Sequence, residues 1–282
     1  MKDQIFVTEM FMSVQGEGAR VGRRTLFVRL FGCNFKCRGF GMSKGQLSDE
    51  YEVSAEIHKR VQFKTIDEVP VPVTGCDSFI AWDKRFRDLS KKYTASELVS
   101  ELREQAKTNG MKPDIVFTGG GPLMHQDVLF KKIIPNIMDV YDVCTFETNG
   151  TYPLNEEVFE AMVMDQHYTR NRFYFSVSPK LSNSGEPKEK RLNPKAIESY
   201  HKAGGDVTFK FVVDGTVLHE VIEANRELGN SNYKFDVYVM PSGAGKDEYQ
   251  RNAKSVAEFA LSNCLNYSPR LQIDLFNNAW ST

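Results

Sequence analysis

Two cysteines stand four positions apart near the start of the chain, in the segment Gly32-Cys33-Asn34-Phe35-Lys36-Cys37. A loop that contains glycine can turn two thiolates at this spacing toward one metal centre, and iron–sulfur clusters are normally held by cysteine thiolates. Two idle or buried thiols would have the same spacing, and zinc also accepts Cys and His ligands. The five histidines, at 58, 125, 167, 201 and 219, show no paired spacing near these cysteines. The segment therefore indicates a metal centre without deciding which metal.

The other three cysteines are Cys76, Cys144 and Cys264. No apolar run approaches the roughly 18 residues that span a bilayer, and the first 14 residues lack the basic start and apolar run of a signal peptide. We therefore expect a cytoplasmic protein, in which clustered cysteines serve as metal ligands or nucleophiles rather than as disulfides. Cys144, at the centre of an expected strand, and Cys264, in the expected last helix, are interpreted as core residues.

The chain has 282 residues, a formal net charge of −1 and 41% hydrophobic residues. This length allows one large α/β domain or two small ones, and a core of that size needs no disulfides. A balanced charge does not indicate a nucleic-acid or membrane partner.

From about residue 95 onward, short apolar segments alternate with amphipathic ones. We expect helices over 95–108, 128–138, 217–228 and 247–261, and strands over 114–117, 142–146, 173–177, 207–213, 235–239 and 271–275. This alternation predicts an α/β fold with a mostly parallel sheet and outer helices, curled by right-handed crossovers toward an open or closed barrel. Residues 38–75 are polar and interrupt the rhythm, so we expect an insertion or long functional loop within a single domain, 1–282.

Polar turns follow one expected strand after another. They are 118–122 (Thr-Gly-Gly-Gly-Pro), 147–150 (Glu-Thr-Asn-Gly), 178–180 (Ser-Pro-Lys) and 240–243 (Met-Pro-Ser-Gly). In parallel α/β folds, ligands bind at the carboxyl ends of the strands, and glycines let the backbone approach a ligand closely. Each turn alone also fits a plain connection. Together they predict a binding site at this end of the sheet.

A family resemblance is carried by residues 13–18 (Ser-Val-Gln-Gly-Glu-Gly) and 26–37, which ends in the two-cysteine segment. These segments resemble the start of 7-carboxy-7-deazaguanine synthases, which are radical S-adenosylmethionine (SAM) enzymes of the 7-deazapurine pathway. In that family a third cysteine follows the second after two residues and precedes Asp-Thr. Here position 40 is Phe, and Cys76-Asp77-Ser78-Phe79 resembles the missing piece, displaced by residues 38–75.

The resemblance implies a partial (β/α) barrel of the radical SAM type and a [4Fe–4S] cluster on Cys33, Cys37 and Cys76. A displaced third ligand is physically reasonable because the entropy of loop closure grows only with the logarithm of loop length. The alternative is that Cys76 is an ordinary loop thiol and that the cluster is lost. Three ligands leave one iron open, and in the family this iron chelates the amino and carboxylate groups of SAM, which then yields a 5′-deoxyadenosyl radical.

The turns then acquire expected roles by resemblance. The family's Thr-Gly-Gly-Glu-Pro uses its Glu to contact the SAM amino group, and here Gly121 takes that place. The loss of this carboxylate predicts weaker SAM binding or a substitute group. The Ser-Pro-Lys turn resembles a SAM-contacting tripeptide, and the 240–243 turn matches a later one approximately. The residues implied in SAM binding are Gly120, Ser178, Pro179, Lys180, Met240, Pro241, Ser242 and Gly243.

On the substrate side, the resemblance implies a site for 6-carboxy-5,6,7,8-tetrahydropterin. A guanidinium such as that of Arg29 suits a planar carboxylate, and Glu17 would accept from the N–H edge of the ring. Ser78 stands where the family has a Mg²⁺-binding Thr, and Mg²⁺ accepts oxygen ligands. The residues implied in substrate binding are Val14, Gln15, Gly16, Glu17, Arg29 and Thr118.

The expected reaction is the radical ring contraction of the pterin to 7-carboxy-7-deazaguanine with loss of ammonia. The resemblance further implies a homodimer and an electron donor such as flavodoxin, with no direct nucleic-acid contact and no membrane, in the cytoplasm of a host cell if the source is viral. One alternative is another radical SAM enzyme, such as a glycyl-radical activase, although that class lacks the signature of residues 15–18. Phe40 and Gly121 motivate the other alternative, a degenerate relative that binds a metal without chemistry.

Overall fold

A single nine-stranded sheet organises the protein. The computed structural model describes residues 4–107, 110–164, 172–229 and 234–282, and within them the strand order is β3-β1-β2-β4-β5-β6-β7-β8-β9. Strand β1 pairs antiparallel with β2 and with β3, and every other neighbouring pair is parallel. The strands are β1 (Gln4–Val14), β2 (Arg24–Leu30), β3 (Lys91–Thr94), β4 (Asp114–Gly119), β5 (Cys144–Thr148), β6 (Phe173–Val177), β7 (Asp206–Val213), β8 (Asp236–Pro241) and β9 (Asn266–Tyr267).

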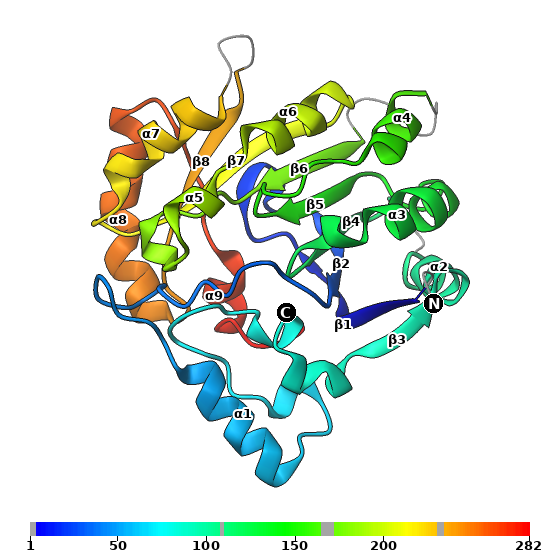
Figure 1. Cartoon of the computed structure of the whole chain (residues 1–282), viewed down its shortest axis with the longest axis horizontal. Helices are drawn as coiled ribbons and strands as arrows, with labels where there is room; N and C mark the ends of the chain where they lie inside the picture. The colour runs from blue at the N-terminus through cyan, green and yellow to red at the C-terminus, as the bar shows by residue number, and fades with distance from the viewer. Residues whose placement is uncertain (1–3, 108–109, 165–171, 230–233) are drawn as a thin grey trace.

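Helices cover the outer face of the curved sheet (Figure 1). They include α2 (Ala95–Gln105), α3 (Gln126–Val128), α4 (Glu156–Met164), α5 (Lys188–Arg191), α6 (Pro194–Lys202), α7 (Leu218–Leu228) and α8 (Lys246–Ser262). α3 continues as a π-helical turn over Leu129–Ile133 and a 3-10 turn over Ile134–Asn136. The expected α/β fold, with a mostly parallel sheet curled into a partial barrel and helices outside, is therefore confirmed. No helix within the described ranges is both long and apolar enough to cross a membrane.

The two faces of the sheet differ in chemistry because side chains alternate along a strand. Phe117, Phe146 and Phe175 stack across three neighbouring strands, with ring centroids 5.9 and 5.3 Å apart, and Phe175 stacks on Tyr200 of α6 at 4.5 Å. These aromatic side chains form the core beneath the helices. Their neighbours in sequence must point to the inner face, which is where the polar side chains of β4, β5 and β6 lie.

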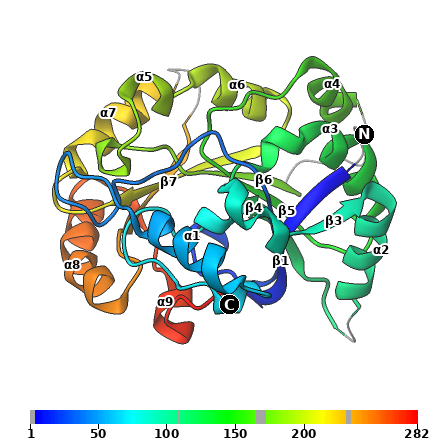
Figure 2. The same ribbon diagram turned by 60° about the horizontal axis from the view of Figure 1, so that its bottom comes forward.

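Residues 38–75, which were expected to be an insertion or a long functional loop, contain the helix α1 (Glu50–Val61). The buried residues Tyr51 and Ala55 of α1 pack with Phe79 and Phe86 in a small hydrophobic cluster separate from the main core. Figure 2 shows α1 beside the opening of the barrel, close to the C-terminus. Because α1 has its own apolar contacts, the insertion is an ordered structure next to the site.

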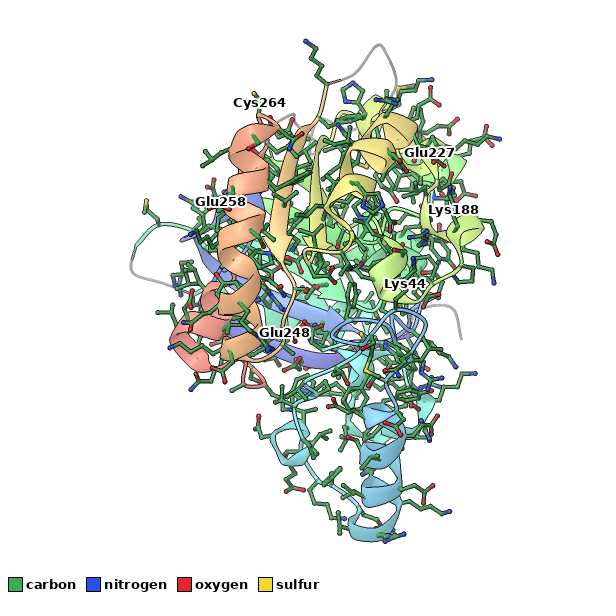
Figure 3. The ribbon with its side chains drawn as sticks, turned by 90° about the vertical axis from the view of Figure 1, so that its left-hand side faces the viewer. Lys44, Lys188, Glu227, Glu248, Glu258 and Cys264 are labelled. Atoms are coloured by element: carbon green, nitrogen blue, oxygen red, sulfur yellow. The ribbon has the colours of Figure 1, made fainter. Side chains whose placement is uncertain are left out.

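Other expectations need correction. The apolar alternation at 271–275 predicted a strand, but these residues form the helix α9 (Leu271–Phe276), in which Ile273 is buried and Leu275 is exposed. The expected last helix is α8, which α9 follows. Cys264 is not in the core: it lies beyond the end of α8 and is exposed (Figure 3). The strand β1 was not expected, and Thr108, the expected end of α2, lies outside the described residues.

Candidate functional site

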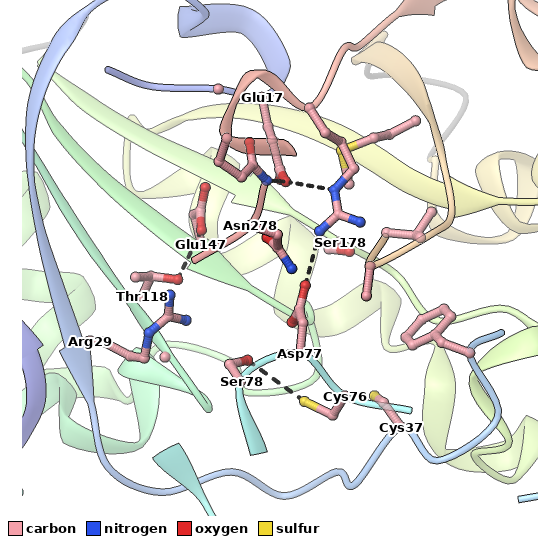
Figure 4. Close-up of a pocket in the computed structure, with 18 of the residues that line it drawn as sticks. Glu17, Arg29, Cys37, Cys76, Asp77, Ser78, Thr118, Glu147, Ser178 and Asn278 are labelled. Atoms are coloured by element: carbon pink, nitrogen blue, oxygen red, sulfur yellow. Dashed lines mark hydrogen bonds and ion pairs between the residues drawn. The ribbon is translucent and has the colours of Figure 1, made fainter. Parts of the chain in front are cut away.

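A cavity of about 260 Å³ lies at the carboxyl ends of the parallel strands, on the inner face of the sheet (Figure 4). The polar turns predicted to form a binding site meet there. Of the predicted site residues, only Pro179 and Pro241 are absent from its lining. The cavity is lined by Val14, Gln15, Gly16, Glu17, Arg29, Cys33, Cys37, Cys76, Ser78, Thr118, Gly120, Ser178, Lys180, Met240, Ser242 and Gly243.

The three predicted cluster cysteines all line this cavity, and after burial, which is the largest cause, Cys76 raises the pKa of both Cys33 and Cys37. The backbone N–H of Phe35 donates to Sγ of Cys33 at 3.4 Å, and the indole N–H of Trp82 donates to Sγ of Cys76 at 3.4 Å. Hydrogen bonds of this kind to cysteine sulfurs tune iron–sulfur clusters. Cys76 is thus directed into the site, although 38 residues separate it from the Cys33–Cys37 loop.

The base of the insertion explains why Cys76 reaches the other two cysteines. The N–H of Gly75 donates to the carbonyl of Phe40 at 2.7 Å, and the N–H of Ser48 donates to the carbonyl of Arg38 at 2.7 Å. The carboxylate of Glu50, at the start of α1, accepts from the N–H groups of residues 73 and 74, each at 2.8 Å. The chain therefore leaves the cavity near residue 40 and returns to the same point at residue 75.

Glu186 holds the loop of the first two cysteines. Its Oε1 accepts from the N–H of Lys36 at 2.7 Å and from the N–H of Cys37 at 2.8 Å. Cys37 has a φ of 49°, a left-handed conformation that is uncommon for a residue with a side chain. Two donated hydrogen bonds to one carboxylate stabilise this turn, which keeps the Cys37 thiol at the cavity wall.

Burial determines the protonation of the three cysteine thiols. Burial raises the pKa of Cys33 to about 11 and also raises the pKa values of Cys37 and Cys76. Such thiols are protonated at neutral pH until a metal displaces the protons. Among the described residues, no three His, Cys, Asp or Glu side chains are grouped closely enough to bind one metal ion. In a [4Fe–4S] cluster each thiolate binds a different iron, so the cysteine sulfurs lie farther apart than the ligands of a single metal ion.

One row of the sheet carries the charged groups on the inner face. Glu9 of β1 is opposite Arg29 of β2, and Arg29 is opposite Thr118 of β4. Thr118 in turn donates from its hydroxyl to Oε2 of Glu147 at 2.8 Å. The buried carboxylate of Glu9 pairs with Nε of Arg29. The two terminal nitrogens of the guanidinium do not take part in this pair. The register of the sheet therefore positions Arg29 to bind an anion.

Glu17 is held by three donors from distant parts of the chain. Lys210 of β7 pairs with its Oε2, while Arg270, at 3.2 Å, and Gln272 donate to its Oε1. Burial alone would raise the pKa of Glu17, but the charges of Lys210 and Arg270, together with these hydrogen bonds, lower it to about 2. Glu17 is thus an ionised acceptor in a fixed orientation at neutral pH.

The expected SAM turns are crowded against the cysteine loop. A Cβ on Gly120 would lie 2.0 Å from the carbonyl oxygen of Gly32, so a side chain cannot fit at this position. Nζ of Lys180 donates to Oγ of Ser178 at 3.0 Å and lies 5.8 Å from the ring centre of Phe40. The side chain of Lys180 therefore faces the same wall as the cysteines.

Several residues of the site were not predicted. Glu9 and Lys210 each interrupt an apolar strand, and a charge in such a strand was a signal that could have identified them. Nothing in the sequence pointed to Glu186, Arg270 or Gln272, because each lies far along the chain from the residue that it contacts.

The chain is similar over nearly its full length to curated 7-carboxy-7-deazaguanine synthases. It is 28% identical over 271 residues to that of Hyperthermus butylicus, which covers 95% of this chain and 91% of the relative. It is 24% identical over 298 residues to that of Halobacterium salinarum, which covers 98% of this chain and 92% of the relative. No family model matches the chain.

The crystal structure of QueE from Escherichia coli has a similar fold. It aligns with a TM-score of 0.57 and 18% sequence identity, covering 94% of this chain and 93% of that one. The fold similarity thus extends over nearly the whole of both chains.

Proposed function

We propose that this homologue of the 7-carboxy-7-deazaguanine synthases is itself a radical SAM enzyme that converts 6-carboxy-5,6,7,8-tetrahydropterin to 7-carboxy-7-deazaguanine with loss of ammonia. The observation that carries this proposal is the meeting of Cys33, Cys37 and Cys76 in one cavity with Glu17 and Arg29. The cysteines carry the expected cofactor chemistry, and the other two residues carry the expected substrate recognition.

Cys33, Cys37 and Cys76 would hold the [4Fe–4S] cluster. The donor set fits this group because three thiols line the cavity, and two of them accept N–H hydrogen bonds, Cys33 from Phe35 and Cys76 from Trp82. The same cavity fits SAM. Gly120 lets its turn pack closely against Gly32 and Cys33, Ser178 offers a hydroxyl, and Lys180 offers a cation to a carboxylate. When bound, these cofactors supply the radical chemistry, and the chain supplies binding, orientation and electrostatics.

Arg29 and Glu17 would orient the pterin. The pairing of Nε with Glu9 orients the guanidinium of Arg29, so its two terminal nitrogens can donate side by side to the two oxygens of the substrate carboxylate. Glu17 is ionised and can accept from the N–H groups of the ring. Both side chains are mostly buried, with exposed fractions of 20% and 14%, so little water competes for these contacts.

Mg²⁺ at Ser78 is part of the same proposal. Oγ of Ser78 lies 3.6 Å from Sγ of Cys76 and lines the cavity. A Mg²⁺ ion there would take its other oxygen ligands from the substrate carboxylate and from water. A flavodoxin-type electron donor, a homodimer and a cytoplasmic location remain predictions of the resemblance.

Anaerobic reconstitution followed by turnover tests the proposal. The full chain, loaded with iron and sulfide and then reduced, should bind about four irons per chain and convert the carboxy-tetrahydropterin in the presence of SAM. Product and ammonia are measured together. Iron binding and SAM cleavage without consumption of the pterin would indicate a different radical SAM enzyme. A chain that binds no iron would be a degenerate relative, as Phe40 and Gly121 suggested.

A further inference from the structure

Arg270 connects three segments that would each bind a different ligand. This residue immediately precedes α9, and its side chain is buried, with 7% of its surface exposed. Nε donates to Oε1 of Glu17 at 3.2 Å, Nη2 donates to Oδ2 of Asp77 at 2.9 Å, and Nη1 donates to the carbonyl of Gly243 at 2.5 Å. One guanidinium therefore contacts the expected substrate-binding segment 14–17, the segment that follows Cys76, and the expected SAM-binding turn 240–243.

The planar guanidinium is suited to this arrangement. It has five N–H donors in fixed directions, whereas the ammonium group of a lysine is a single point charge on a flexible stem. The backbone N–H of Arg270 also donates to the Tyr249 hydroxyl at 3.3 Å, which fixes where the side chain begins. Replacement by Lys would thus keep the charge and lose most of the directed bonds.

The partners of Arg270 place it between Glu17, the expected substrate acceptor, and Asp77, the neighbour of Cys76. Asp77 follows Cys76 directly, so the Arg270–Asp77 bond restrains the backbone that carries the Cys76 thiol. Glu17 has both oxygens occupied, and Arg270 and Gln272 share Oε1. Movement of Arg270 toward either partner would weaken its bond to the other.

We propose that Arg270 is a positioning residue that sets Cys76 and Glu17 in one mutual arrangement, so that the third cluster ligand and the substrate acceptor are ordered together. Its effect on Glu17 as a substrate contact rests on the proposed function. Its effect on Cys76 does not, because that effect concerns the position of a thiol in the chain without iron.

The first experiment uses the full chain without iron. The rates at which Cys33, Cys37 and Cys76 react with iodoacetamide are measured separately by peptide mass spectrometry in the parent and in Arg270→Lys. Loss of the Asp77 bond should raise the Cys76 rate about fivefold or more, while the other two rates change less than about twofold. Their loop is held by Glu186 and not by Arg270.

Two further variants separate positioning from general destabilisation. Asp77→Asn weakens the same bond, because an amide oxygen accepts less strongly than a carboxylate, and should raise the Cys76 rate by a similar or smaller factor. The double variant should exceed neither single variant by much, because both substitutions act on one bond. Arg103→Gln loses the exposed pair with Asp139, far from the cavity, and should leave all three rates unchanged. Equal acceleration of all three cysteines, or no acceleration of Cys76, would overturn the proposal.

The second experiment uses the reconstituted enzyme. Arg270→Lys should raise KM for the pterin about tenfold, because Glu17 loses a directed donor, whereas Asp77→Asn should change KM less than about threefold. A purely structural role would lower the amount of folded enzyme in both variants without this difference in KM. An unchanged KM in Arg270→Lys refutes the substrate half of the proposal. Failure of the parent to turn over the pterin refutes the proposed function instead, and the alkylation rates still decide the role of Arg270.

Discussion

The backbone N–H of Gly75 is hydrogen-bonded to the carbonyl of Phe40 at 2.7 Å, so two residues 35 positions apart are neighbours at the cavity wall. By the family resemblance, Phe40 stands where a third cysteine is expected, and Cys76 directly follows Gly75. The two ends of the segment 40–75 therefore meet, and Cys76 lies beside Phe40 at the cavity wall.

Loss of Cys76 should abolish the cluster. With Cys76→Ala, two thiols remain at the wall, and we expect the iron content after anaerobic reconstitution to fall from about four per chain to well below one. Cys264→Ala is the matched control because Cys264 is exposed beyond α8, and it should retain the iron content of the parent. A cluster that survives in Cys76→Ala would exclude Cys76 as a ligand.

A cysteine at position 40 should rescue that variant. Phe40 lines the same cavity and is joined to Gly75, so a thiol there would lie near the place of Cys76. We expect Phe40→Cys combined with Cys76→Ala to recover at least about a third of the parent's iron, measured with the absorption of the reconstituted cluster. Phe40→Ser in the same background is the control and should recover none. If the cysteine and serine variants bind equally little iron, the neighbouring positions of residues 40 and 76 are not equivalent for the cluster.

Restoring the family's carboxylate at position 121 should tighten SAM binding. Gly121 has a φ of −145°, which any residue adopts, and a Cβ there would meet its nearest neighbour, the sulfur of Met124, at 3.5 Å. Gly121→Glu should therefore fold, and a charge-assisted hydrogen bond to the SAM amino group should lower Kd about tenfold. Equilibrium binding of SAM to the reconstituted protein measures this change. Gly121→Gln separates charge from size, and equal affinity of both variants would contradict a role for the charge.

The ionisation of Glu17 should make folding sensitive to acid. Its pKa is lowered in the folded chain from 4.5 to about 2, so its contribution to stability is present above about pH 4.5 and is lost as the pH falls toward 2. Full loss corresponds to up to about 3 kcal/mol in the free energy of unfolding. Denaturant unfolding between pH 6 and pH 3 should thus show a smaller pH slope for Glu17→Gln than for the parent.

The control for this prediction is Glu258→Gln, because Glu258 is 65% exposed on α8 and its pair with Lys254 is long, at 3.8 Å. Its pH slope should match that of the parent, since exposed pairs contribute little. A Glu17→Gln variant with the slope of the parent would mean that Lys210 and Arg270 do not hold the Glu17 carboxylate in the folded chain.

The local sequence pattern was sufficient to predict much of the fold and part of the candidate site. The alternation of short apolar strands with amphipathic helices predicted the parallel sheet, and the polar turns after those strands predicted the end of the barrel at which the cavity lies. Residues 14–17, Cys33 and Cys37 were predicted as site residues because they belong to short motifs of neighbouring residues. These features depend on a few consecutive residues, which is the range over which periodicity and motif spacing carry information.

Tertiary structure alone decided the rest. The segment 271–275 alternates like a strand but forms α9, because the sheet already ends at β9 and only Ile273 is buried. The donors to Glu17, the hydrogen bonds of Glu186, and the bonds of Arg270 to Glu17 and Asp77 each join residues more than a hundred positions apart. Side chains this distant meet only after the sheet has curled and the insertion has closed on itself, so no local pattern could predict their contacts.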